Sequence, residues 1–218
     1  MDFFLQLLVN GVCVGLLYGI SAMGFVMIFK SSSVLNFAHG ELLALGAFFF
    51  LALITWAKLP VLVAFLLTLI GCFMLGFLIE RFFLRPLIGE KLIFVIMLTV
   101  GLAAMFKGLI LLIWGGNLYT YPSFLNESMA LNLGAIYIAP VYTATLIISI
   151  IFLVIFGLFF KKSAQGIYMR SVADNQKAAL SLGVHVRRVF ALSWAIAALV
   201  ASMSGIVLGI MNGVNVHD

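Results

Sequence analysis

Charge is the scarcest property of this chain. Only 9% of its 218 residues are charged, whereas 65% are hydrophobic, and the mean hydropathy is +1.28. An ordinary soluble domain carries about a quarter charged residues. So few charges could not divide the apolar surface of a globule of this size into small patches. The composition therefore excludes a water-soluble globular protein and predicts an integral membrane protein.

Cysteine, histidine and nucleotide-binding motifs are also sparse. The two cysteines, Cys13 and Cys72, lie in apolar stretches, where a free thiol behaves as a small hydrophobic group, so we expect neither a disulfide framework nor a metal site. Three histidines without a His-Glu-x-x-His pattern argue against an intramembrane metalloprotease. The chain also lacks a G-x-x-x-x-G-K-[ST] loop, so any nucleotide energy must come from a separate subunit.

Apolar residues, by contrast, occur in long unbroken blocks. A membrane-spanning helix needs about 20 of them and satisfies its own backbone hydrogen bonds. The strands of a β-barrel would alternate apolar and polar residues instead. We therefore predict an all-α polytopic helix bundle of about six spans, forming a single transmembrane domain over residues 1–218. The predicted spans are residues 4–29, 40–57, 60–79, 92–114, 140–160 and 189–211.

The basic residues gather in alternate loops. Ten of the twelve lysines and arginines follow the first, third or fifth predicted span, and six of these ten lie between Lys161 and Arg188. Because short cytoplasmic loops carry the positive excess, these loops are predicted to face the cytoplasm, and both residue 1 and residue 218 to face outside. The net charge of +5 then reflects topology rather than a nucleic-acid-binding surface.

Two stretches carry glycine at every fourth position. They comprise Gly11, Gly15 and Gly19 in the first span, and Gly205, Gly209 and Gly213 at the end of the sixth. Small residues at this spacing let helix backbones approach closely where lipid provides no hydrophobic drive for association. We interpret both stripes as helix-packing surfaces, with a transport path lined by glycine backbone as the alternative.

A few polar residues lie at or near membrane depth. Asn36, His39 and Glu41 lie in the segment that joins the first two spans, and an ionisable residue entering a span is a candidate for function. They could line a solute path or gate, cap the second span, or contact a neighbouring subunit; Glu41 would suit the positive end of that helix. Lys107 lies inside the fourth span, about 6 Å from its midpoint. It could snorkel, pair with a carboxylate or meet an anionic solute, and we favour snorkelling or pairing.

The polar stretch 161–188 is predicted to be a cytoplasmic loop that contains a short helix. Asp174 would cap the start of this helix and Gly183 would end it. Between them, Ala178 and Ala179 contribute to a small apolar surface surrounded by basic residues. Such a helix can lie on a membrane or dock into the groove of a partner.

Several of these segments resemble a known family. Lys177-Ala178-Ala179 followed by Gly183 resembles the EAA-x3-G coupling loop of ABC importer permeases, with Lys177 at the usually acidic position. Other segments resemble high-affinity branched-chain amino acid permeases of the LivH type, and the likeness covers nearly the whole chain. These segments are Asn36–Glu41, Glu80–Arg81, Arg85–Pro86, and the run from Gly183 through Arg188 to the second glycine stripe.

The resemblance implies a multi-pass permease subunit of the bacterial inner membrane, not itself an enzyme, in an ATP-driven importer of leucine, isoleucine and valine. Its implied partners are a homologous second permease, two cytoplasmic ATPases that bind ATP and Mg²⁺, and a periplasmic or extracellular solute-binding protein. The chain itself would hold no cofactor. The residues implied in the ATPase contact are Asp174, Lys177, Ala178, Ala179 and Gly183.

The resemblance also leaves alternatives. Family members continue past the glycine stripe into further helices, so we expect this chain to be shorter than typical members. Permeases for urea and short amides share the same segments and are the main alternative. A secondary transporter is less favoured, because no Asp or Glu lies deep inside a predicted span. A membrane scaffold subunit is the remaining possibility.

Overall fold

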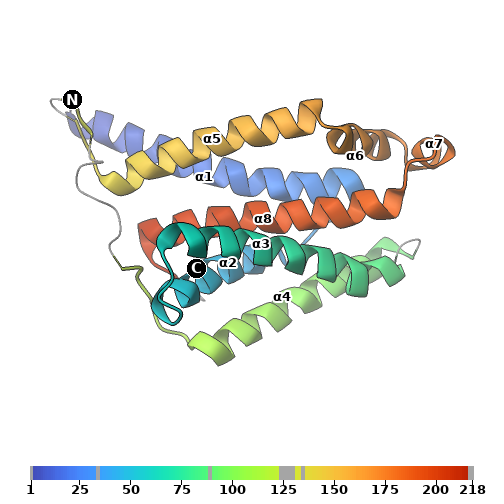
Figure 1. Ribbon diagram of the computed structural model, residues 1–218, viewed down its shortest axis with the longest axis horizontal. Coiled ribbons are helices and arrows are strands. Elements are labelled where there is room, and N and C mark those ends of the chain that lie inside the picture. The colour runs from blue at the N-terminus through green and yellow to red at the C-terminus, as the bar shows by residue number, and fades with distance from the viewer. Residues whose placement is uncertain (1, 33–34, 88–89, 123–130, 134–135, 216–218) are drawn as a thin grey trace.

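The chain forms an elongated bundle of helices that run mainly along its length (Figure 1). The computed structural model describes residues 2–32, 35–87, 90–122, 131–133 and 136–215. Its α-helices are α1 (Asp2–Ser32), α2 (His39–Thr55), α3 (Val61–Ile79), α4 (Leu92–Trp114), α5 (Pro140–Lys162), α6 (Ala164–Asp174), α7 (Gln176–Ser181) and α8 (Val186–Asn212). A π-helical turn, η1 (Glu80–Leu84), and a 3-10 turn, η2 (Arg85–Leu87), follow α3. Two short antiparallel strands, β1 (Leu131–Leu133) and β2 (Ile136–Ile138), precede α5.

Each of the six predicted spans corresponds to a helix. Five of the described helices are long and apolar enough to cross a membrane, namely α1, α3 with its extension to Leu87, α4, α5 and α8. The sixth, α2, is apolar but has only 17 residues, or about 26 Å of helix, which is the lower limit for a span. The predicted all-α membrane bundle is confirmed.

The boundary after the third span differs from the prediction. The charged residues predict a break at residues 80–91, but the helical segment continues through η1 and η2 as far as Leu87. Glu80 and Arg81 are compatible with helix; their charges mark a change of surroundings and do not disfavour helical backbone. The first charged residues therefore marked where the apolar run ends, and the helical segment continues beyond that point.

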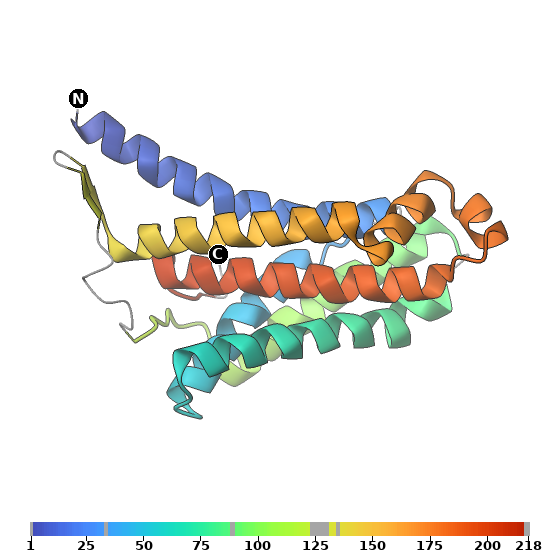
Figure 2. The ribbon, with the colours of Figure 1, turned by 45° about the horizontal axis from the view of Figure 1, so that its top comes forward.

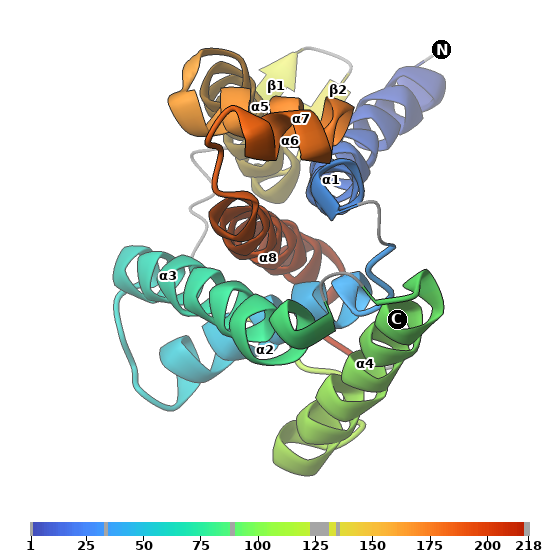
Figure 3. The same cartoon turned by 90° about the vertical axis from the view of Figure 1, so that its right-hand side faces the viewer.

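Helix α8 is the core of the bundle, with the other long helices arranged around it (Figure 3). It packs against α1, α2 and α3. A methyl group on Gly205 of α8 would overlap the carbonyl oxygen of Leu43 in α2, and one on Gly46 of α2 would overlap Ser202 of α8. The two backbones are thus in direct contact, which is possible only because these positions lack side chains.

The two glycine stripes have different surroundings. A Cβ atom on Gly209 would lie 2.9 Å from the ring of Tyr121, and Gly213 ends α8 with a φ of +83°. A Cβ atom on Gly11, Gly15 or Gly19 would meet nothing within 4 Å among the described residues. The stripe on α8 therefore lies inside the fold, whereas the stripe on α1 makes no close contact with another helix among the described residues.

Candidate functional site

Helix α2 begins inside the bundle, part-way along α1 and α8 (Figure 2). Asn36 and Ala38, just before it, are each only 1% exposed. His39, its first residue, contacts the carbonyl of Ser21, which lies about 16 Å along α1 from the final residue of that helix. The amino end of α2, with its partial positive charge, therefore lies beside the middle of a candidate membrane span, at membrane depth.

His39 is held in one orientation. A carbonyl oxygen can only accept, so Nε2–H donates to the Ser21 oxygen at 3.0 Å and Nδ1 is left as an acceptor. Phe25 contacts the imidazole edge-on, with 5.9 Å between ring centroids. A Cβ atom on Gly24 would lie 2.9 Å from Cε1 of His39. Gly24 therefore provides the space for this ring, a role that sequence reasoning did not identify.

Asn36 forms the turn that starts α2. Its Oδ1 accepts a hydrogen bond from the backbone N–H of Ala38 at 3.0 Å, as in an Asx turn. Among the described residues, Nδ2 of Asn36 and Nδ1 of His39 are buried without hydrogen-bond partners. Such groups are costly to bury unpaired. The start of α2 thus has one buried donor and one buried acceptor without a partner among the described residues.

Glu41 and Lys107 bring opposite charges to the same region. Glu41 lies in the first turn of α2 and interacts electrostatically with Lys107 of α4. The partial positive charge of the helix end also favours a carboxylate at this position. The four residues predicted for a solute path or gate, Asn36, His39, Glu41 and Lys107, are therefore gathered at or beside the start of one helix.

The capping prediction for the cytoplasmic helix is wrong. Asp174 is the last residue of α6 rather than the cap of the next helix, and Asn175 separates α6 from α7. Asn175 has extended backbone, with φ −155° and ψ 102°, and its Oδ1 accepts from the N–H of Ala178 at 3.0 Å. A cap needs this non-helical backbone. Asp174 lacks it because α6 continues through that residue.

Gly183 ends α7 as predicted by its residue type. Its φ is +82°, and its N–H donates to the oxygen of Leu180 at 3.0 Å while the N–H of Val184 donates to Ala179 at 3.0 Å. This pair of bonds is a Schellman motif, which favours glycine. Ala179 is 2% exposed and packs into an apolar cluster with residues of α6 and α8. Lys177 and Ala178 remain exposed.

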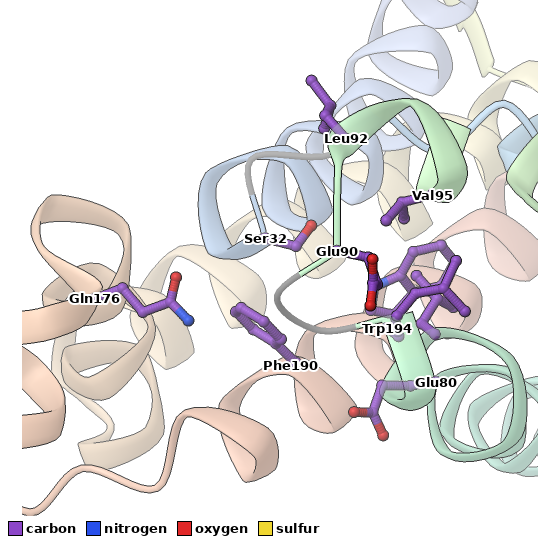
Figure 4. Close-up of a pocket in the computed structure, with 10 residues that line it drawn as sticks. Ser32, Glu80, Glu90, Leu92, Val95, Gln176, Phe190 and Trp194 are labelled. Carbon is purple, nitrogen blue, oxygen red and sulfur yellow. The ribbon is translucent and has the colours of Figure 1, made fainter. Parts of the chain in front are cut away.

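A cavity of about 170 Å³ lies between α7 and the adjoining ends of the long helices (Figure 4). Glu80, which begins η1, lines it and is 1% exposed. Neither oxygen of this carboxylate has a hydrogen-bond partner among the described residues, and its ion pair with Nε of Arg85 is long, at 3.9 Å. Gln176, the first residue of α7, lines the same cavity. Sequence reasoning did not select Glu80 as a site residue; its signal was a carboxylate directly after an apolar run.

The described residues contain no cluster of three or more potential metal ligands. Cys13 and Cys72 are both free and buried.

Comparison with known proteins gives a consistent result. Residues 7–217 match the family described as branched-chain amino acid transport system, permease component. The high-affinity branched-chain amino acid transport system permease protein BraD of Pseudomonas aeruginosa is 30% identical, over 97% of this chain and 72% of BraD. The permease proteins LivH of Salmonella typhimurium and Escherichia coli K12, which bear the same description, are 29% and 28% identical with the same coverage. No solved structure matches the chain.

Proposed function

This chain belongs to the permease-component family of branched-chain amino acid transport systems, and from that premise we propose that it is a membrane-spanning subunit of an ATP-driven importer of leucine, isoleucine and valine. The observation that carries the proposal is the family match, which extends over residues 7–217. Among the described residues, five helices are long and apolar enough to span a membrane, which supports the permease role. A second permease, two ATPases that bind ATP and Mg²⁺, and a solute-binding protein would complete the importer.

Helix α7 is suited to contact an ATPase. Its outward surface combines Lys177 and Ala178 with Leu180 and Leu182, which are 54% and 83% exposed. Apolar side chains this exposed outside the spans are typical of interaction surfaces. On its inward side, Ala179 packs in an apolar cluster with residues of α8, and the Schellman motif at Gly183 ends α7 just before that helix. Movement of α7 with a bound ATPase would therefore be transmitted to the central helix of the bundle.

The start of α2 is the proposed solute contact. An amino acid has a carboxylate that would be favoured at the positive end of a helix, as at discontinuous helices of other transporters. Nδ2 of Asn36 and Nδ1 of His39 would provide a donor and an acceptor. In this arrangement the permease needs only weak affinity, because the solute-binding protein would supply the solute.

Transport by the assembled importer tests the substrate. The chain would be expressed with its partner subunits and reconstituted in liposomes. We expect ATP-dependent uptake of leucine, isoleucine and valine, together with ATPase activity that rises when the loaded solute-binding protein is added. Uptake of urea or acetamide without uptake of the three amino acids would contradict the proposed substrate, while ATP-independent uptake would contradict the importer mechanism.

Ala178→Asp tests the ATPase contact. A new carboxylate on the exposed surface of α7 should weaken binding of the ATPase at least tenfold and uncouple transport, while the subunit stays in the membrane. Ala57→Asp, also exposed but in the turn after α2, is the matched control. Co-purification of ATPase with tagged permease measures the effect. Equal recovery of ATPase with both variants would exclude α7 as the contact.

His39→Ala and Glu41→Gln test the solute path. Either change should lower uptake at least tenfold per assembled transporter, because His39→Ala removes the imidazole and Glu41→Gln removes the negative charge at the start of α2. Uptake rates are divided by the amount of complex in the membrane. Unchanged rates per complex, with only lower abundance, would assign both residues to packing or helix capping.

A further inference from the structure

An open groove of about 390 Å³ runs between α1 and α5. Its walls are almost entirely apolar and include Gly19, Met23 and Met27 of α1 and Phe156, Gly157 and Phe160 of α5. A Cβ atom on Gly19 or Gly157 would meet nothing within 4 Å among the described residues. The missing side chains at these two positions keep the groove open.

The α1 wall of this groove is about as long as one leaflet of a bilayer is deep. The residues of α1 that line it extend from Gly19 to Lys30, a distance of about 16 Å along the helix. The hydrocarbon core of a bilayer is about 30 Å thick, so the groove has about the depth of a single acyl chain layer. Its Lys30 end is also the end of the bundle from which the basic loops project.

The groove ends at unpaired cations. Lys30 and Lys161, in the last turns of α1 and α5, both line it. Neither lysine forms a salt bridge among the described residues, where the ion pair is that of Arg85 with Glu80. Two ammonium groups are thus placed where the apolar groove meets the headgroup region.

A second hollow, of about 350 Å³, adjoins this basic end and shares Lys30 and Phe160 with the groove. Arg170 lines it, and its guanidinium donates to the carbonyl oxygens of Phe160 at 2.9 Å and Lys161 at 3.3 Å. Asp174 is the acidic residue of this lining. With Lys161 at its edge, the region has three cations against one carboxylate and is net positive.

We propose that the groove binds an anionic phospholipid of the cytoplasmic leaflet. One acyl chain lies along the apolar walls between α1 and α5, and the headgroup lies between Lys30 and Lys161, beside Arg170. Basic pockets between helices on the cytoplasmic side are suited to anionic headgroups. The lipid site does not depend on the identity of the transported solute. Its test is therefore independent of the test of the proposed function.

Lipid binding to the purified full chain in mild detergent tests the proposal. Native mass spectrometry would compare phosphatidylglycerol with phosphatidylcholine of the same acyl chains. We expect the anionic lipid to bind more tightly and the double variant Lys30→Gln/Lys161→Gln to lose about 25-fold in affinity for it, at roughly fivefold per lysine. Lys58→Gln, at the opposite end of the bundle, should have no effect. Equal binding of the two lipids, or unchanged affinity in the double variant, would overturn the proposal.

Filling the groove separates this site from general lipid adhesion. Gly157→Phe should displace the bound acyl chain, while Gly101→Phe, at a position on α4 where a Cβ atom also meets nothing within 4 Å, should not. Another transmembrane subunit is the competing occupant. If assembly with that subunit protected the thiol of Gly157→Cys from a maleimide reagent and no lipid were retained, the groove would be a subunit interface and the lipid site would be wrong.

Discussion

At the scale of single residues, the position of the His39 ring at the start of α2 depends on contacts between a few atoms. The ring of His39 lies between its hydrogen bond to Ser21 and the backbone at Gly24. The residue types of Asn36, His39 and Glu41 indicated a polar site from sequence alone. Gly24 gave no such signal, because it is one of twenty glycines and its importance comes from a ring fifteen positions later in the chain.

Gly24→Ala should destabilise the protein by about 1–3 kcal/mol, the usual cost of overpacking. The new methyl would lie 2.9 Å from the His39 ring and 3.2 Å from the carbonyl oxygen of Ala197, and the ring is held by its hydrogen bond. Gly15→Ala, in open space on the same helix, should be neutral or stabilising by up to about 1 kcal/mol. Thermal unfolding in detergent compares the two, and equal effects would contradict the packing role of Gly24.

Gly183→Leu should loosen α7 through its backbone rather than through a clash. A Cβ atom at this position meets nothing within 4 Å, but φ is +82°, and the left-handed region costs a non-glycine residue about 1–2 kcal/mol. Amide hydrogen exchange in residues 176–184 should therefore accelerate about tenfold. Gly183→Asn is the control, because Asn tolerates this region. Equal protection in the two variants would show that the Schellman motif is dispensable.

At the scale of elements, helix contacts decide what the residue patterns mean. Glycine at every fourth position occurs on both α1 and α8, and the pattern alone predicts packing for both. In the structure, Gly205 contacts α2, whereas Gly11, Gly15 and Gly19 face open space among the described residues. The spacing indicates where a close approach is possible; the partner is determined by the arrangement of the whole bundle.

Gly205→Val should disrupt the contact between α8 and α2. The added atoms would overlap the Leu43 carbonyl, and backbone cannot move aside as a side chain can, so we expect a loss of about 3 kcal/mol or more. Gly101→Val places the same side chain in open space on α4 and controls for the lower helix propensity of valine. Thermal stability and recovery of folded protein measure both variants. A small, equal loss in each would contradict direct backbone contact.

At the scale of the whole molecule, the distribution of charge predicts orientation. Lys58 lies in the loop between α2 and α3, at the end of the bundle opposite α6 and α7 (Figure 1). Because the basic loops should face the cytoplasm, Lys58 should lie outside and Lys177 inside.

Labelling with a membrane-impermeant maleimide tests this orientation. Lys58→Cys and Lys177→Cys would be introduced separately after replacement of Cys13 and Cys72 by alanine, which removes the two buried thiols. In intact cells only the Lys58→Cys variant should react, and the Lys177→Cys variant should react only after the membrane is opened. The opposite pattern would invert the predicted orientation.

The sequence by itself determined that the protein is an integral membrane protein, how many apolar helices it has and roughly where they begin and end, and the family to which it belongs. These properties depend on composition, run length and local motifs, which a linear chain displays directly. Glycine as the terminator of α7 was also predictable, because a positive φ restricts the residue type locally.

The tertiary structure alone decided that α8 is the central helix, that α2 starts at membrane depth, and that Asn175 rather than Asp174 caps α7. It also brought Glu80 to a cavity beside Gln176 and placed Lys30 and Lys161 at the end of one groove. These features join residues far apart in sequence or depend on the exact residue at which a helix ends. They are set by which helices can approach closely, and that depends on side chains meeting across helices rather than on the order of residues along one of them.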